Sequence, residues 1–181
     1  MIKEDSLALE TRRNIYNLIL GNPGLHEREI ARKMGLSLST LDYHLHYLEK
    51  REMVVSKKDG RYTRYFASFK VGTRDKKIIA ILRQKTPRSI ILFLLTNPDS
   101  IHKDICRGVK KSPSTISFHL KKMVNAGIIE ATSLGRETAY SVNNSDEVIK
   151  LLISYKNTFL DGAVDRFVET WSSLNPGLIK E

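Results

Sequence analysis

Two stretches of the chain share a run of side chains that could contact a polyanion. Residues 37–55 read SLSTLDYHLHYLEKREMVV, and residues 112–130 read SPSTISFHLKKMVNAGIIE. Both contain the pattern S-x-S-T-x-x-[YF]-H-L, which combines hydroxyls, an aromatic ring and a histidine. Hydroxyls donate hydrogen bonds to phosphates and base edges, and the lysines nearby neutralise phosphate charge. The repeated string therefore indicates nucleic-acid binding, if these side chains share an exposed face.

A helix would place them on one face, because successive residues turn by about 100 degrees. The opposite face of each helix is apolar and is predicted to pack on a core; it comprises Leu38, Leu41, Leu45 and Leu48 in the first copy and Ile116, Leu120 and Met123 in the second. The residues predicted to contact DNA from the two helices are Ser39, Thr40, Asp42, Tyr43, His46, Lys50, Ser114, Thr115, Ser117, Phe118, Lys121 and Lys122.

Three of these residues need an explanation of their own. Tyr43 and Phe118 put an aromatic ring on the outward face, where it could contact thymine methyl groups in a major groove or pack against a partner surface. The groove contact is favoured because hydroxyls and lysines surround each ring. Asp42 would be repelled by phosphate unless it accepts from a cytosine amino group or is held by a basic residue.

A predicted hairpin follows each helix, and the first is strongly basic. Its turn lies at Asp59-Gly60, and its candidate DNA contacts are Lys57, Lys58, Arg61 and Arg64. Such a density of cations suits a phosphate backbone or a narrow minor groove. The second hairpin, with its turn at Leu134-Gly135, keeps Arg136 alone, beside Glu137.

The histidines do not indicate a metal site or a catalytic site. His44 and His119 fall at the edge of the apolar stripe, where a packed histidine hydrogen-bonded to nearby backbone is expected. The chain has a single cysteine, Cys106, so a thiolate-rich zinc site is excluded. No phosphate-binding glycine loop, nucleophile elbow or paired carboxylates can be recognised. We expect no metal, no cofactor and no enzymatic activity.

The repeated string belongs to a longer internal duplication. A shift of 75 residues aligns Arg13 with Arg88, Asn22-Pro23 with Asn97-Pro98, and Tyr65 with Tyr140, without a gap. Two copies are too few for a solenoid, because its units need neighbours on both sides to bury a core. Each copy is therefore expected to fold as a small domain.

Periodicity and capping residues predict three helices and a hairpin in each copy. The fold class expected is mainly α with small β-wings (α+β), formed by two tandem winged helix-turn-helix domains and a long C-terminal helix. The expected domains are residues 1–70 and 86–144, joined by a linker helix at 71–85 and followed by a dimerisation helix and tail at 145–181.

Both copies resemble winged helix-turn-helix domains of the ArsR-like group, in which the third helix carries an S-x-x-S-x-H-L-type pattern followed by a glycine and a hydrophobic strand. The arrangement as a whole resembles tandem winged-helix transcription regulators of archaea. The resemblance covers residues 6–67 and 86–142. It implies a DNA-binding fold, whereas the metal-sensing mode of some relatives lacks its ligands here.

Charge agrees with a polyanionic partner. The 181 residues carry a formal net charge of +10, and the basic excess lies in the two repeats rather than in the tail. Residues 1–10 are acidic where a signal peptide would be basic, and no apolar run reaches the roughly 20 residues that a bilayer span needs. We expect a cytoplasmic protein.

The tail from Ser145 to Leu174 has the periodicity of one long helix. Its stripe of large apolar side chains is too wide for a small domain to cover, so homodimerisation is expected. The predicted dimer contacts are Leu152, Tyr155, Phe159, Ala163, Phe167 and Trp171. The alternative is that the tail folds back onto the repeats. Gly162 could mark a kink, a break or a close approach of two backbones.

The function expected from these features is sequence-specific binding of double-stranded DNA and regulation of transcription. The recognition helices at 37–51 and 112–126 would enter major grooves, with the wings on the backbone or minor groove. One alternative is a tandem winged-helix interaction module, similar to the ScpB subunit of chromosome-condensing complexes. Another is a basal-transcription or chromatin factor with weak sequence discrimination. A small ligand is conceivable, but the sequence does not support one.

Overall fold

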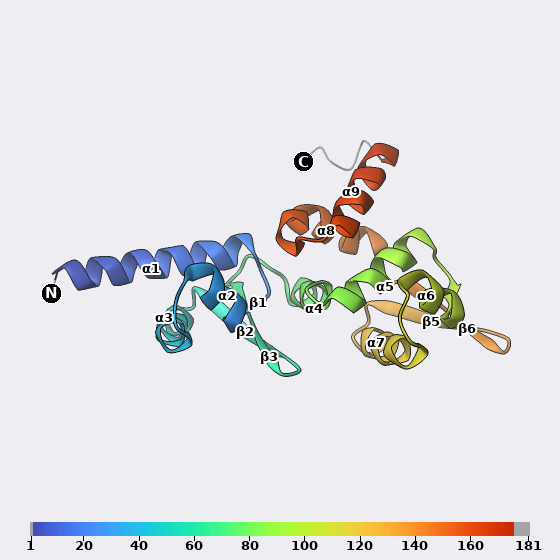
Figure 1. Ribbon diagram of the computed structural model, residues 1–181, viewed down its shortest axis with the longest axis horizontal. Helices are drawn as coiled ribbons and strands as arrows, with labels where there is room; N and C mark the ends of the chain where they lie inside the picture. The colour runs from blue at the N-terminus through green and yellow to red at the C-terminus, as the bar shows by residue number, and fades with distance from the viewer. Residues whose placement is uncertain (1, 176–181) are drawn as a thin grey trace. The chain divides into compact units, whose positions relative to one another are not determined.

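The computed structural model describes residues 2–175, with side chains described from residue 7 onward. The chain divides into two compact units, Met1–Ala80 and Ile81–Glu181, and Figure 1 shows the elements of each. Each unit contains three helices and a three-stranded antiparallel sheet in the order of a winged helix. The predicted fold class, mainly α with small β-wings, is confirmed.

The first unit consists of α1 (Ile2–Gly21), β1 (Leu25–His26), α2 (Glu27–Met34), α3 (Leu38–Lys50), β2 (Val54–Asp59), β3 (Tyr62–Ala67) and most of α4 (Thr73–Leu82). Helix α1 packs against α3 and β3, and α2 packs on α3. The core joins Ile15 and Ile19 of α1 to Ile30 of α2 and to the apolar stripe of α3. Burial of these side chains supplies most of the driving force that holds α3 in place.

The second unit repeats this order and adds two helices. It consists of α5 (Lys85–Thr96), β4 (Ser100–Ile101), α6 (His102–Val109), α7 (Pro113–Asn125), β5 (Ile129–Leu134), β6 (Glu137–Val142), α8 (Ser145–Phe159) and α9 (Gly162–Leu174). Helix α5 packs against α6, α7 and β6. Pro113 at the start of the helix and Ser112 at the cap begin α7.

The predicted wings form, but their two-residue turns are Gly60-Arg61 and Gly135-Arg136, one residue further along than predicted. Gly60 and Gly135 have φ of +61° and +65°, a conformation that glycine adopts without strain. The hairpins pair Asp59 with Tyr62 and Leu134 with Glu137 across two-residue turns. The two-residue strands β1 and β4 add a third strand to each sheet, through Leu25 with Tyr65 and Ser100 with Tyr140. Sequence periodicity did not predict these strands because they are too short to show alternation.

The tail is not one long helix. Helix α8 ends at Phe159, Leu160 turns left-handed with φ of +50°, and α9 begins at Gly162. The Asp161 carboxylate accepts a hydrogen bond from the Ala163 N–H at 3.0 Å and so caps α9. The prediction of a single helix from Ser145 to Leu174 was wrong, whereas the break into two helices, one of the alternatives at Gly162, is present, because the Asp161 cap starts a second helix in the middle of the apolar stripe.

Candidate nucleic-acid interface

Each recognition helix, α3 or α7, begins with the same cluster of hydroxyls. The Ser37 hydroxyl accepts from the Thr40 N–H at 3.1 Å and lies 2.8 Å from the Thr40 hydroxyl. Ser112 makes the same pair of contacts with Thr115, at 3.4 and 2.8 Å. The hydroxyls of Ser39 and Ser114 lie 3.0 and 3.3 Å from their cap serines. This cluster surrounds a helix N-terminus, whose N–H groups and dipole favour an anion.

The apolar face of each recognition helix is turned inward, with one exception. The buried side chains are Leu41, Leu45 and Leu48 in α3 and Ile116, Leu120 and Met123 in α7. Leu38, which helical geometry placed on the same stripe, is 47% exposed. Leu38 is the first residue of α3. It faces the same side of the helix as the buried leucines, but it lies beyond the end of the core along the helix axis. That part of the prediction was wrong.

The polar face of each helix is turned to solvent. Tyr43 is 62% exposed and Phe118 is 66% exposed, so neither ring is covered by its own domain. Exposed around them are Ser39, Thr40, Asp42, His46 and Lys50 on α3 and Ser114, Ser117 and Lys121 on α7, while Thr115 and Lys122 are half-buried. Hydroxyls, rings and cations thus form two surfaces, one along each helix. The major groove of DNA is wide enough to admit an α-helix.

Helix α1 adds an arginine to the first surface. The Arg12 Nη2 donates to the Tyr43 hydroxyl at 3.4 Å, and its guanidinium lies 3.8 Å from the centre of the Tyr47 ring. Arg12 therefore stacks on one aromatic ring and orients another. Sequence reasoning missed it because the duplication places Pro87 at the matching position of the second copy. Its contacts depend on the packing of α1 against α3, which no local pattern reveals.

His44 and His119 pack beside the exposed rings. Their rings stand edge-on to Tyr43 and Phe118, each at 5.2 Å between centroids, and both Nδ1 atoms are buried without a hydrogen-bond partner. The packed position was predicted, whereas no hydrogen bond to backbone is formed at Nδ1. Burial lowers the pKa of both histidines, helped by the charge of Arg12 beside His44 and of Lys122 beside His119.

These histidines make stability depend on pH. The pKa values of both histidines are lower in the folded chain than the value of about 6.5 in the unfolded chain. Their contribution to the free energy of unfolding is therefore fully present above about pH 6.5. As the pH falls through that value towards their folded-state pKa values, the unfolded chain takes up protons first. We expect the free energy of unfolding to fall, at a slope of at most about 1.4 kcal/mol per pH unit for each proton.

Urea denaturation between pH 7.5 and 5 measures this slope. The double variant His44→Gln/His119→Gln should show a smaller slope than the parent chain, whatever its stability at neutral pH. His26, whose pKa burial also lowers, keeps part of the slope in the variant. His46→Gln is the control, since His46 is exposed on the same helix. Equal slopes in parent and double variant would refute the assignment to His44 and His119.

The Ser117 hydroxyl has a partner within the domain. It lies 2.8 Å from the His102 Nε2, and the His102 Nδ1 lies 3.6 Å from the Cys106 Sγ. Ser117 thus joins α7 to α6 and is held in position at the exposed surface. Within residues 7–175, no group of three or more histidine, cysteine, aspartate or glutamate side chains could hold a metal ion.

The wings present fewer cations than predicted. Lys58, Arg61 and Arg136 are exposed and Lys57 is half-buried, but Arg64 is only 4% exposed. The Arg64 Nε donates to the Asp59 Oδ2 at 2.8 Å, and its Nη1 donates to the Gly24 carbonyl oxygen at 2.9 Å. The prediction that Arg64 contacts DNA was wrong, because this arginine ties the wing to the turn before β1.

The C-terminal helices pack on their own domain. Leu152 is fully buried, and Phe159 and Phe167 are each 8% exposed. Helix α9 lies against α5, and the Arg88 Nε donates to the Asp161 Oδ2 at 2.8 Å. The Arg83 guanidinium donates to the Thr158 carbonyl oxygen at 2.7 Å. The prediction of Leu152, Phe159 and Phe167 as dimer contacts was wrong, because the domain itself covers them; Tyr155, Ala163 and Trp171 are half-buried.

Two domain models match the chain. Residues 9–79 match an N-terminal HTH domain, and residues 85–131 match the bacterial regulatory protein, arsR family. The two matches do not overlap, so the chain contains two helix-turn-helix domains in tandem. None of the described helices is long and apolar enough to cross a membrane.

One relative from an archaeon is an HTH-type transcriptional regulator of Methanocaldococcus jannaschii, described as uncharacterized. It is 36% identical to this chain over 143 residues, which are 79% of the chain and 36% of that protein. The chain thus spans about a third of the length of this relative.

Solved structures resemble the chain weakly. A zinc-responsive MarR family member, ZitR of Lactococcus lactis, is 13% identical with a TM-score of 0.32, over 77% of this chain and 81% of that one. The DIP2311 protein of Corynebacterium diphtheriae is 13% identical with a TM-score of 0.30, over 74% of this chain and 26% of that one. Likeness at this level establishes no shared function.

Proposed function

We propose that this chain, which carries two helix-turn-helix domains in tandem, binds double-stranded DNA in a sequence-specific manner and regulates transcription. The observation that carries the proposal is the pair of exposed faces on α3 and α7, each with an aromatic ring, hydroxyls and at least one lysine. A single exposed ring has many explanations, but the same ring at the same repeat position in both domains favours one shared ligand. The net charge of +10 adds the attraction that phosphates require.

In this proposal the hydroxyl clusters at the N-termini of α3 and α7 hold phosphates, while Tyr43 and Phe118 contact thymine methyl groups. Lys50 and Lys121 neutralise phosphates beside the groove. Lys58 and Arg61 of the first wing contact the adjacent backbone. Each domain alone binds weakly, and joining two on one chain raises the effective concentration of the second. The protein works in the cytoplasm, without catalysis and without a metal.

The salt dependence of binding tests the electrostatic part. We expect log K to fall linearly with log salt for a duplex selected from a random pool, since bound lysines release counterions. The variant Lys50→Gln/Lys121→Gln should reduce the slope by about 0.9 for each phosphate that it no longer neutralises. Lys150→Gln, an exposed lysine on α8, is the matched control and should leave the slope unchanged.

The same measurements separate the alternatives. A salt-insensitive or undetectable interaction with DNA would favour a protein-interaction module like those that resemble the ScpB subunit. A steep slope with no enriched sequence in the selected pool would favour a basal-transcription or chromatin factor.

We propose further that the chain forms a homodimer through the apolar surface that α8 and α9 leave uncovered. Leu160 is 83% exposed in a left-handed conformation that leucine rarely adopts, and Leu174 is 72% exposed. Tyr155, Ala163 and Trp171 are half-buried beside them in the chain. Sedimentation equilibrium should give a dimer, and Leu160→Glu should raise its dissociation constant at least about tenfold, as the removal of one apolar side chain from an interface implies. A monomeric parent chain would refute this step.

A further inference from the structure

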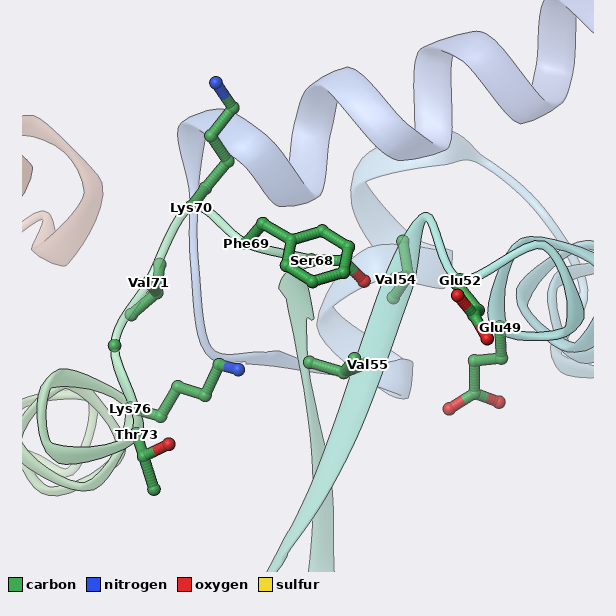
Figure 2. A pocket seen from close by; sticks show the side chains of 11 residues that line it. Glu49, Glu52, Val54, Val55, Ser68, Phe69, Lys70, Val71, Thr73 and Lys76 are labelled. Atoms are coloured by element: carbon green, nitrogen blue, oxygen red, sulfur yellow. The ribbon is translucent and has the colours of Figure 1, made fainter.

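The first domain contains an open surface cavity of about 590 Å³ that DNA contacts do not explain. It lies between the C-terminal end of α3, strand β2 and the connection from β3 to α4 (Figure 2). Its apolar wall includes Val54, Val55 and Val71. A volume of this size is in the usual range for small-molecule sites.

Two residues at this cavity hold a backbone conformation that suits neither of them. Glu52 has φ of +55° and Phe69 has φ of +60°. The matching positions in the second domain are Gly127 and Asn144, with φ of +69° and +50°. In both domains the same hydrogen bond closes the turn that follows the recognition helix. The Glu52 N–H donates to the Glu49 carbonyl oxygen, and the Gly127 N–H donates to the Val124 carbonyl oxygen, each at 2.9 Å.

At these two positions the side chains differ between the domains, whereas elsewhere the relation is reversed, because Gly24 and Gly35 of the first domain match Asp99 and Lys110 of the second, all with positive φ. The fold requires the left-handed conformation at both positions in both domains, and the second domain fills them with residues that tolerate it. The first domain keeps a glutamate and a phenylalanine there, at a cost in free energy. The Phe69 ring is 94% exposed, so its burial within the domain does not offset that cost. A contact made by these side chains with something bound would offset it.

The charges around the cavity are separated by sign. Figure 2 shows Glu49 and Glu52 on one side, and Lys76 reaching from α4 toward Val55 on the other, while Lys70 points away. In the part of the chain that the structure describes, Glu49, Glu52 and Lys76 form no ion pair with another residue. The Ser68 hydroxyl is buried at the cavity without a hydrogen-bond partner. A buried hydroxyl without a partner is uncommon in folded proteins.

We propose that this cavity binds a free amino acid with an apolar side chain. Its ammonium group is held by Glu49 and Glu52, and its carboxylate by Lys76, each through charge-assisted hydrogen bonds. Its side chain lies on the Phe69 ring and the valines. The interior of a peptide carries no such pair of opposite charges on its backbone, so the free amino acid fits the charge pattern better.

Isothermal titration calorimetry on the full chain, without DNA, tests the site. The probes are L-phenylalanine and L-leucine, each compared with its N-acetyl derivative and its carboxamide. We expect saturable binding of at least one free amino acid, and about tenfold weaker binding of both blocked forms, since each forgoes one charge-assisted hydrogen bond. Equal affinity for free and blocked forms, or no binding of either amino acid at millimolar concentration, would overturn the proposal.

Variants that copy the second domain separate a ligand site from a structural role. Glu52→Gly and Phe69→Asn replace the strained residues with their repeat counterparts, so each should melt at the same temperature as the parent or higher. Each should also bind the free amino acid about tenfold more weakly. Lys76→Gln should do the same, and Lys77→Gln is the control on α4. Full affinity in Glu52→Gly and Phe69→Asn, or a lower melting temperature for both, would contradict the assignment.

One consequence rests on the proposed function. Glu49 belongs to the recognition helix α3, so a ligand held there is an effector that changes DNA affinity. We expect the dissociation constant for the selected duplex to change at least about fivefold at saturating amino acid, the low end of allosteric coupling. No change would overturn the effector step alone. Failure of DNA binding by the free protein would overturn the proposed function, while calorimetry still decides the site.

Discussion

Asp161→Ala is expected to lower the free energy of unfolding of the second domain by about 3 kcal/mol in all, of which about 2 kcal/mol comes from breaking a part-buried ion pair, less than a fully buried pair would cost. Arg88 is 6% exposed, and its Nε and Nη2 both donate to the Asp161 Oδ2, at 2.8 and 2.5 Å. Without the carboxylate, the buried guanidinium keeps its hydrogen bond to the Leu82 carbonyl oxygen, at 2.7 Å, but its negative partner is gone. The variant also removes the cap of α9, which accounts for the remaining loss of about 1 kcal/mol.

The pH dependence of this effect has a definite sign. Burial by itself would raise the pKa of Asp161, but hydrogen bonds from Arg88 and from the Ala163 N–H hold it below its ordinary value. The stabilisation is therefore present above the unfolded-state pKa of about 4, and it is lost as the pH falls through the folded-state pKa. The difference between parent and Asp161→Ala should shrink below about pH 4.

Urea denaturation followed by circular dichroism measures both effects. Asp146→Ala is the matched control, because Asp146 is an exposed carboxylate in the first turn of α8. It should cost no more than about 0.5 kcal/mol, as a surface charge near a helix terminus does. If Asp161→Ala were as mild as this control, α9 would not be anchored by Arg88, and docking of the tail on α5 would need another explanation.

Removing both outward rings should weaken binding to the selected duplex about a hundredfold. Each ring of Tyr43 and Phe118 is proposed to contact thymine methyl groups, and burial of an apolar side chain contributes about 1.5–3 kcal/mol. Because the rings are 62% and 66% exposed, Tyr43→Ala/Phe118→Ala should change the melting temperature little. Neither ring carries charge, so the slope of log K against log salt should stay the same.

Fluorescence anisotropy with the selected duplex, and with a scrambled duplex, gives the result. Affinity for the scrambled duplex should change much less, since non-specific binding depends on phosphates. Phe69→Asn, measured without added amino acid so that the proposed effector site is empty, is the control, because it removes an exposed ring outside α3 and α7. Unchanged affinity of the double variant for the selected duplex would refute the groove contact and leave a partner surface as the role of the rings.

The sequence by itself predicted the elements that present the interface. The repeated string located both recognition helices, and the helical period separated the buried face of α3 from the face that carries Tyr43. The same holds for the wings, whose turns follow from Gly60 and Gly135. These features depend on neighbours a few residues apart, so a local pattern contains the information needed. Leu38 is the exception, because angular position does not say where a core ends along the axis.

Contacts between residues distant in the chain were not predictable in this way. In the sequence Arg64 does not differ from the other cations of the wing. In the folded domain it is buried and donates a hydrogen bond to the carbonyl oxygen of Gly24, 40 residues away. Arg12 had no repeat counterpart, and only the packing of α1 brings it to Tyr43. The apolar stripe of the tail has to be buried against another surface. Periodicity could not show whether that surface belongs to a partner chain or to the domain's own α5.

The pair Arg13 and Arg88 shows what the sequence determined and what only the tertiary structure decided. The duplication puts the same residue at the same position of the first helix in both domains, and the sequence therefore determines two copies of one fold. In the first domain Arg13 is exposed, whereas in the second Arg88 is buried against Asp161, 73 residues further along the chain. Periodicity fixes which face of a helix is apolar, because that depends on spacing alone. Whether a charge on it meets water or a carboxylate depends on which distant segment packs there, and only the folded chain decides that.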